Sequence, residues 1–193
     1  MENGTEQSQE AESRLIAIGD IHGCAAAFDA ILGLIAPGPS DTIVTLGDYV
    51  DRGPDSRAVV ERLIALKSEC QLIPLLGNHE EMMLNVLTGE SPANLWLRYG
   101  GVETLDSYGF TGDLSVVPQE HIRFLQACPS FHGEQTHFFT HANYVADEPL
   151  EQQPVEALRW QSLPEHFPKQ HHSGRTAVVG HTSQRTGEVL DRG

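Results

Sequence analysis

Basic residues are scarce in this sequence of 193 residues: 12 lysines and arginines stand against 27 aspartates and glutamates, a formal net charge of −15. A nucleic-acid-binding surface needs clustered lysines and arginines, so this balance argues against nucleic-acid binding. The sequence also lacks any run of about 18 apolar residues, the length that a membrane-spanning helix requires. We therefore expect neither a nucleic-acid partner nor a membrane partner.

Cysteine is also scarce. The three cysteines, Cys24, Cys70 and Cys128, are odd in number and far apart in the sequence. This pattern favours free thiols in a reducing cytoplasm over a disulfide framework. We therefore expect a cytoplasmic protein, and we expect Cys24 to be a small buried residue.

The length of the chain fits one domain, because a chain of this size can bury a single well-formed core. Residues 1–13 hold four glutamates and no apolar segment of the kind found in signal peptides. We expect residues 1–13 to form a disordered N-terminal tail and residues 14–193 to form a single folded domain.

The first half of the sequence alternates short β-rich runs with apolar residues at helical spacing. Repeated strand, turn and helix units indicate parallel strands joined by crossover helices, which is an α/β fold. Such units place ligand sites beyond the carboxyl ends of their strands. The expected strands are 14–18, 42–46 and 71–75, and the expected helices are 25–35 and 56–67, the second capped by Ser56.

The second half is less regular. Residues 82–127 indicate several short helices with a break at Gly100-Gly101. Two strands around a tight turn, a short helix and a last strand follow, and the histidine-rich stretch between them is expected to be an exposed loop. The strands are 131–133, 136–140 and 176–179, the helix is 154–160 and the loop is 166–172.

Five polar clusters stand directly after apolar runs, and together they supply aspartate, asparagine and histidine side chains. Oxygen and imidazole ligands in this mixture suit manganese, iron or zinc, and the lack of thiolates argues against a structural zinc site. Glycines in these clusters let the backbone turn sharply and bring short side chains inward. The clusters are GDIHG at 19–23, GDYVDRG at 47–53, GNHE at 77–80, HA at 141–142 and GHT at 180–182.

Each cluster alone has a structural explanation. Asp20 and Asn78 could cap helices, His141 and His181 could be satisfied core histidines, and Asp51-Arg52 could be a surface ion pair. All five clusters occur at predicted strand ends, however, and this joint occurrence favours one shared functional site.

The motifs GDIHG, GDYVDRG and GNHE, followed by HA and GHT, resemble those of the calcineurin-like metallophosphatases. The resemblance runs from Arg14 to the C-terminus and is strongest to the serine/threonine protein phosphatase branch and its small bacterial members. It implies a two-sheet β-sandwich flanked by helices, with metals at the sheet edge. Relatives usually continue beyond the GHT motif, so we expect a domain that is shortened at its C-terminus.

The resemblance also implies two divalent metal ions, with manganese expected first and iron or zinc as alternatives. Two such ions share a water and acidify it, and the resulting hydroxide attacks phosphorus directly. One ion is bound by two residues, the other by three, and one residue bridges them. The implied ligands are Asp20 and His22 for the first ion, Asn78, His141 and His181 for the second, and Asp48 as the bridge.

Three further residues match catalytic positions of the family. Arg52 matches the arginine that holds phosphate, and its planar fork suits two phosphate oxygens. His79 matches the general acid, and Asp51 would hydrogen-bond His79 and orient it. A second phosphate-binding arginine is expected at Arg159, beside Trp160, with Arg175 as the alternative; Tyr144 is more readily a core or rim residue than part of the substrate cleft.

The resemblance leaves three functions open. The first is a phosphomonoesterase that acts on phosphoserine or phosphothreonine in proteins, or on small phosphoesters, with no regulatory subunit. The second is a nucleotide hydrolase similar to symmetrical diadenosine tetraphosphatases, whose second motif usually lacks the aspartate matched here by Asp51. The third is an inactive binding module on the same scaffold.

Overall fold

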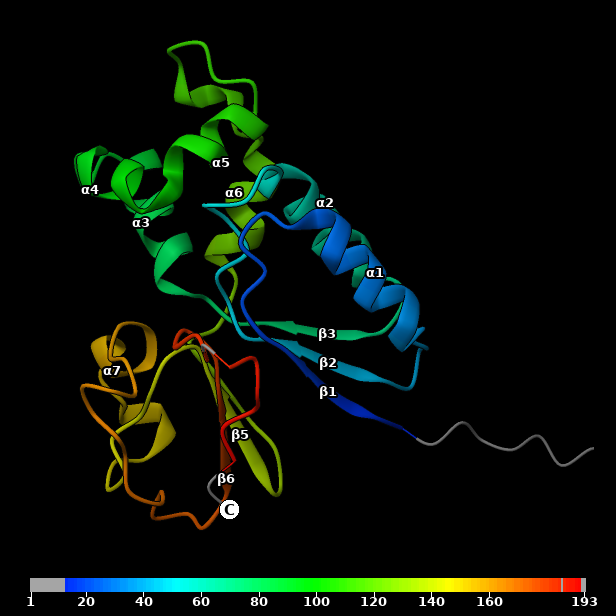
Figure 1. Cartoon of the computed structure of the whole chain (residues 1–193), viewed down its shortest axis with the longest axis vertical. Helices are drawn as coiled ribbons and strands as arrows, with labels where there is room; N and C mark the ends of the chain where they lie inside the picture. Colours follow the sequence, from blue (N-terminus) through cyan, green and yellow to red (C-terminus); the bar gives the residue numbers. More distant parts are fainter. Residues whose placement is uncertain (1–12, 185, 192–193) are drawn as a thin grey trace, which may run out of the picture.

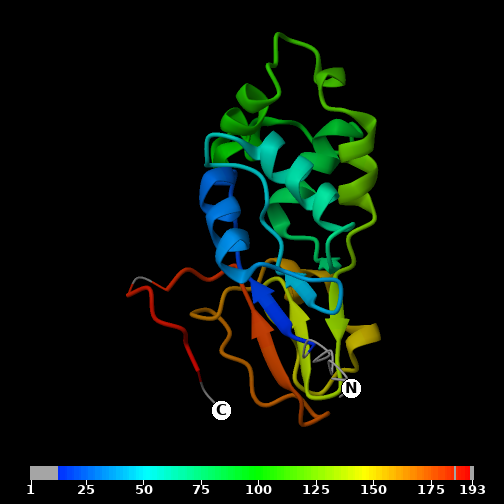
Figure 2. The same ribbon diagram turned by 90° about the vertical axis from the view of Figure 1, so that its right-hand side faces the viewer.

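The computed structural model describes residues 13–184 and 186–191. These residues form two three-stranded sheets with most of the helices on one side of them (Figures 1 and 2). The expected N-terminal tail therefore lies outside the described residues, except for Ser13. The α/β architecture of two sheets flanked by helices confirms the predicted fold class.

The first sheet contains three parallel strands in the order β1 (Leu15–Ile18), β2 (Thr42–Thr45) and β3 (Gln71–Pro74). The crossovers between them are α1 (Ala25–Ile35) and α2 (Ser56–Leu66). Parallel strands need such crossover connections, and the repeated units of the sequence predicted them. All three carboxyl ends consequently lie at one edge of the sheet.

A large apolar core lies between the first sheet and the helices. α1 contributes Phe28 and Leu32 to it, and α2 contributes Val59 and Leu63, all buried. Their spacing of four residues places each pair on one helix face. Burial of one such side chain stabilises the fold by about 1.5–3 kcal/mol.

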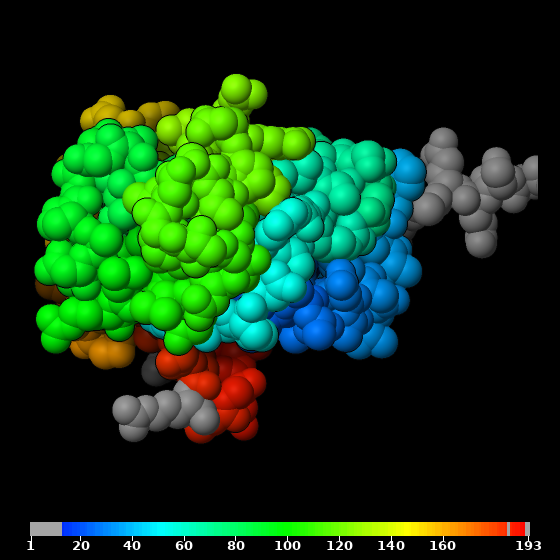
Figure 3. Space-filling model, turned by 90° about the horizontal axis from the view of Figure 1, so that it is seen from above, coloured from blue at the N-terminus to red at the C-terminus, as the bar shows by residue number. Residues whose placement is uncertain are grey.

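A helical segment follows β3 and forms one end of the molecule (Figure 3). It is interrupted at Gly100, whose φ of 111° is outside the helical region. The expected break at Gly100-Gly101 is therefore present. The elements are α3 (Asn78–Leu87), α4 (Asn94–Trp96), the π-helical turn η1 (Leu97–Gly101), α5 (Val102–Ser107), η2 (Leu114–Val116) and α6 (Gln119–Gln126).

The second sheet contains β4 (Phe131–Gly133), β5 (His137–Thr140) and β6 (Thr176–Val179). β4 pairs with β5 in an antiparallel manner and β5 pairs with β6 in parallel. A short 3₁₀ turn η3 (Leu150–Gln152) and α7 (Val155–Arg159) lie between β5 and β6 in the chain. A second apolar cluster joins the two sheets through Val44, Leu46, Leu75 and Phe139.

Four local expectations were wrong. Asn78 does not cap a helix, because α3 already begins at Asn78 and its N-cap is Gly77. Asp55 rather than Ser56 caps α2, since its side chain accepts a hydrogen bond from the Ala58 amide at 2.9 Å. Cys24, expected to be buried, is exposed. His171, which belongs to the loop expected to be exposed, is only 2% exposed.

No helix in the described part of the chain has the length and apolarity needed to cross a bilayer. Cys24, Cys70 and Cys128 are all free thiols. The absence of a disulfide among these three residues agrees with the sequence analysis.

Candidate metal centre

The loops after the strands hold side chains on a strained backbone. Six non-glycine residues have positive φ in the described ranges, and five of them belong to the predicted motifs. A non-glycine residue in this region costs on the order of 1–3 kcal/mol and persists where surrounding contacts enforce it. The five are His22 (φ 44°), Asp48 (53°), Asp51 (73°), Arg52 (67°) and His181 (58°).

Gly47 shows how closely these loops approach each other. Its φ is 100°, and a Cβ atom there would lie 2.7 Å from the Gly77 nitrogen and 2.9 Å from Nδ1 of His141. Only glycine fits such a position. The loop after β2 is thus pressed against the start of α3 and the loop after β5.

The imidazole of His141 is completely buried and oriented by a backbone carbonyl. Its Nδ1 lies 2.7 Å from the Leu46 oxygen, so Nδ1 carries the proton and donates it. The bare Nε2 then faces an oxygen of Asp48 at 3.3 Å, the amide oxygen of Asn78 at 3.0 Å and Nδ1 of His181 at 3.2 Å. Lone pairs that converge in this way suit a cation placed among them.

A second group of potential ligands meets the first at Asp48. Nε2 of His22 lies 3.6 Å from Oδ2 of Asp48, and Nε2 of His79 lies 4.0 Å from the same oxygen. Nδ1 of His22 donates to the Val50 carbonyl at 2.9 Å, which leaves Nε2 as the free lone pair. Asp48, His141 and His181 form the other group, so Asp48 is shared by both.

Asp20 contacts the backbone of His181, a member of the group that contains His141. Its Oδ1 accepts a hydrogen bond from the backbone nitrogen of His181 at 3.1 Å. It therefore links the loop after β1 to the loop after β6. It does not cap α1, whose N-cap is Cys24 with no side-chain hydrogen bond.

The pKa shifts fit a cation site. Burial raises the pKa of the Asp48 carboxyl, because an isolated anion is costly in a low dielectric. Burial also lowers the pKa of His22 and His141, and burial together with His141 lowers the pKa of His181 to about 4. Neutral imidazoles can bind a metal, and a nearby cation would restore the charge of Asp48. The donor set therefore fits two divalent ions.

His79 and Asp51 form a buried pair beside these ligands. Nδ1 of His79 lies 2.6 Å from Oδ2 of Asp51, and the two side chains are 1% and 0% exposed. Burial alone would lower the pKa of His79, but the hydrogen bond to Asp51 and the charge of Asp48 raise it overall. The pair can therefore hold a proton on the imidazole at higher pH than a free histidine could.

Two residues of the helical segment support Asp51, and the sequence analysis did not identify them. The indole Nε1 of Trp96 donates to Oδ1 of Asp51 at 2.9 Å, and the hydroxyl of Thr104 donates to the same oxygen at 2.7 Å. The backbone amide of Asp51 is held as well, by Ser56 at 3.0 Å. No sequence signal pointed to Trp96 or Thr104, because they lie 45 and 53 residues from Asp51.

The guanidinium of Arg52 reaches both parts of the site. Its Nη1 donates to Nε2 of His22 at 3.0 Å, and its Nη2 donates to Nε2 of His79 at 2.9 Å. Arg52 is otherwise exposed, which leaves its fork accessible from solvent. The Arg52 guanidinium is therefore positioned to contact an anion that binds near His22 and His79.

Glu80 is a third residue whose role the sequence did not reveal. Its carboxylate is fully buried and accepts four backbone N–H groups from the loops that carry the ligands. The only available signal was its place in the GNHE motif. The donors are Asp48 at 2.8 Å, Tyr49 at 2.7 Å, Val50 at 3.1 Å and Gly77 at 3.0 Å.

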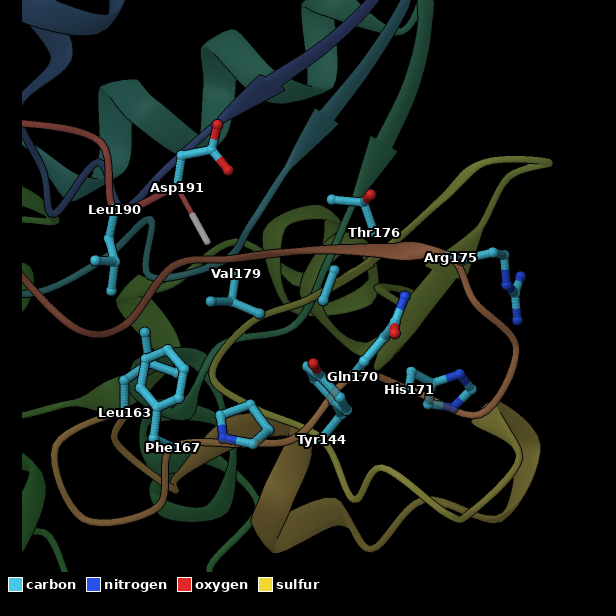
Figure 4. A pocket seen from close by; sticks show the side chains of 12 residues that line it. Tyr144, Leu163, Phe167, Gln170, His171, Arg175, Thr176, Val179, Leu190 and Asp191 are labelled. Carbon is cyan, nitrogen blue, oxygen red and sulfur yellow. The ribbon is translucent and has the colours of Figure 1, made fainter. Parts of the chain in front are cut away.

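The two candidates for a second phosphate-binding arginine lie in different places. Arg159 donates to Ser130 at 2.8 Å and pairs with Glu81, 3.3 Å away. Arg175 and Tyr144 line a separate cavity of about 280 Å³ beside β6 (Figure 4), and none of the predicted metal ligands lines it. Arg159 is the better placed of the two to contact phosphate, because it pairs with Glu81, the residue that directly follows the GNHE motif.

Known proteins resemble this chain in part. A segment of 76 residues is 46% identical to a symmetrical bis(5'-nucleosyl)-tetraphosphatase of Acidovorax and covers 39% of this chain. A segment of 85 residues is 39% identical to serine/threonine-protein phosphatase 1 of Salmonella typhimurium and covers 44% of this chain. These segments span only 26% and 37% of those two relatives.

A solved structure described as a candidate diadenosine tetraphosphatase shares the fold. It superimposes with a TM-score of 0.63 at 23% identity, over 89% of this chain and 79% of its own length. Residues 13–190 also match the profile of the calcineurin-like phosphoesterases. Because that match extends over nearly the whole chain, the protein belongs to the calcineurin-like phosphoesterase family.

Proposed function

We propose that the protein is a metal-dependent phosphoesterase that hydrolyses symmetrical dinucleoside tetraphosphates to two nucleoside diphosphates. The observation that carries the phosphoesterase assignment is the sharing of buried Asp48 by two groups of potential metal ligands. Arg52 and the pair of His79 and Asp51 stand directly beside that shared residue. The metal ligands we propose are Asp20, His22, Asp48, Asn78, His141 and His181.

Two divalent ions bound there would lower the pKa of water to near neutrality and neutralise phosphate charge. We propose manganese, with iron or zinc as alternatives, because this mixture of oxygen and nitrogen ligands accepts all three. The backbone carbonyls of Val50 and Leu46 keep the imidazoles of His22 and His141 turned toward Asp48. The protein thus orients the ligands before any ion arrives.

The remaining roles belong to side chains near the opening of the site. Arg52 turns its guanidinium from the two imidazoles to two oxygens of the phosphate under attack. The oxygen of water forms the new bond to phosphorus, and the bridging P–O bond breaks. The leaving oxygen takes the proton of Nε2 on His79, while Asp51 holds the opposite ring nitrogen. Arg159 is proposed as the second phosphate contact.

Two findings support dinucleotides as the substrate class. The Acidovorax relative is a symmetrical bis(5'-nucleosyl)-tetraphosphatase, and the solved structure with a TM-score of 0.63 is described as a candidate for the same class. The Salmonella relative, a protein phosphatase, matches at lower identity.

A second candidate is a serine/threonine protein phosphatase, which the sequence analysis placed first. The specific observation in its favour is Asp51, whose carboxylate lies 2.6 Å from His79 and keeps the pKa of that imidazole raised. A protonated histidine matters most for a poor leaving group such as a serine alkoxide. Phosphorylated proteins therefore belong in the substrate test.

A substrate panel with manganese distinguishes these functions. It contains a dinucleoside tetraphosphate, a phosphoserine peptide, p-nitrophenyl phosphate and a phosphodiester. We expect the highest kcat/KM for the dinucleotide. A higher value for the phosphopeptide would establish the second candidate. Well-folded protein that shows no manganese-stimulated hydrolysis of any compound would instead be an inactive binding module on this scaffold.

A further inference from the structure

A cleft in the helical segment opens next to Arg52. It has a volume of about 490 Å³ and is lined by Arg52, Leu97, Arg98, Tyr99, Val102 and Glu103. Ligand pockets commonly measure about 300–1,000 Å³ and combine apolar walls with a few polar groups. An aromatic ring, two aliphatic side chains, two guanidiniums and a carboxylate give this cleft such a mixture.

Gly100 fixes the cleft to the catalytic loop. The backbone nitrogen of Arg52 donates to the Gly100 oxygen at 3.2 Å. A Cβ atom at position 100 would lie 2.5 Å from that nitrogen, and the φ of Gly100 is 111°. Only glycine allows this contact. The break in the helix, an irregular π turn of the kind often found at functional sites, therefore sets Arg98 and Tyr99 beside Arg52.

Tyr99 lies beside His79, the proposed general acid. Its ring centroid is 6.4 Å from that of His79, with the two ring planes at 89°. A general acid has to contact the leaving oxygen, so the rest of the leaving group lies close to His79. Tyr99 is 50% exposed, and part of its surface is consequently available to that group.

Arg98 adds a positive charge to the cleft beside Tyr99. Arg98 is exposed, and within the described residues its guanidinium makes no hydrogen bond and no ion pair with another residue. The only acidic residue that lines the cleft with it is Glu103. Although the formal net charge of the chain is −15, the two arginines that line this cleft would attract an anion locally.

We propose that this cleft binds the leaving nucleotide, with the base stacked on Tyr99 and the phosphates held by Arg98. The inference rests on the proposed function, because it takes His79 as the residue that meets the leaving group. Stacking on an aromatic side chain accepts any base. The cleft therefore favours substrates whose leaving group carries a planar ring and a phosphate over peptides and small aliphatic esters.

Kinetics of Tyr99→Ala and Tyr99→Phe test the stacking. We expect Tyr99→Ala to raise KM for a dinucleoside tetraphosphate by roughly 5- to 150-fold, with kcat changed less than about twofold. Tyr99→Phe keeps the ring and should restore the wild-type KM. With β-glycerophosphate, which has no ring, Tyr99→Ala should raise KM much less than it does with the dinucleotide. Phe110→Ala, which removes a partly exposed ring outside the cleft, is the matched control.

Equilibrium binding of ADP to the manganese-loaded protein provides a readout apart from turnover. Calorimetry should show weaker ADP binding for Tyr99→Ala. For Arg98→Gln it should show a weaker ADP affinity that depends less on salt than the affinity of the wild type.

Unchanged KM and unchanged ADP affinity in Tyr99→Ala, with the wild type active on the dinucleotide, would overturn the cleft assignment alone. A wild type that does not hydrolyse the dinucleotide would overturn the proposed substrate instead. If KM for a phosphoserine peptide rose in place of KM for the dinucleotide, the cleft would be a peptide site and the proposal wrong.

Discussion

The carboxylate of Asp51 lies 2.6 Å from Nδ1 of His79 in a region from which solvent is excluded. Trp96 and Thr104 donate hydrogen bonds to the other oxygen of that carboxylate. Asp51 is thereby fixed in one orientation from the helical segment. The loop after β2 supplies Asp51, and the helical segment fixes the orientation of the Asp51 carboxylate toward His79.

Replacement of His79 by asparagine tests its role as the acid. We expect His79→Asn to lower kcat by roughly 10²–10⁴-fold while the metal content stays unchanged. The loss should be larger for a phosphoserine peptide than for a dinucleotide, because an alkoxide needs the proton more than a phosphate does. Steady-state kinetics and elemental analysis provide the two readouts. His166→Asn, at an exposed histidine, serves as the control, and full activity in His79→Asn would remove His79 from the mechanism.

Removal of the Asp51 charge should change the pH profile. The pKa of His79 is raised in the folded protein, so the acid form persists to higher pH than it would for a free histidine. Asp51→Asn replaces the charged acceptor by a neutral amide and so weakens the interaction that raises this pKa, and the alkaline limb of kcat/KM should therefore move to lower pH. Rates measured between pH 5 and pH 10 would show the shift. An alkaline limb at the same pH in the variant would mean that another group titrates.

Glu80 should contribute to stability and to the geometry of the metal site. Its two oxygens accept four backbone N–H groups, and an amide can present only one oxygen to them. We expect Glu80→Gln to lower the free energy of unfolding by about 1–3 kcal/mol, which urea denaturation would measure. Glu61→Gln, at an exposed pair with Arg57, should change it by less than about 1 kcal/mol. Equal free energies of unfolding for Glu80→Gln and Glu61→Gln would contradict the role given to Glu80.

Asp48 is the residue on which both ligand groups depend. Asp48→Asn should reduce the metal content from about two ions per chain to below one, because one neutral oxygen replaces the shared carboxylate. Elemental analysis after gel filtration measures this directly. Asp106→Asn removes an exposed carboxylate and should leave the content unchanged. Retention of both ions by Asp48→Asn would show that Asp48 does not bridge them.

The strands and the ligand-bearing loops could be predicted from the sequence because their signals are local. In each of the first three strands an apolar run is followed by glycine and aspartate or asparagine, and the parallel order then brings these strand ends together. Leu15–Ile18, Thr42–Thr45 and Gln71–Pro74 each lie within a predicted strand. The family motifs added residue roles that local patterns cannot assign.

The contacts that support Asp51 and the ligand-bearing loops were not predictable, because they join distant parts of the chain and no family motif contains them. Trp96 reaches Asp51 only after the helical segment has folded over the first sheet. Glu80 binds amides more than 25 residues away, and no periodic pattern marks such an acceptor. Cys24 and His171 were assigned the wrong exposure because burial depends on tertiary packing, which composition does not specify.

The most direct test of the central claim is anomalous scattering from crystals soaked in manganese. We expect two peaks about 3.5–4 Å apart, with Asp48 between them. His22 should contact one peak, and His141 and His181 the other. A map without peaks among these side chains, from crystals in which the loops are ordered, would contradict the account.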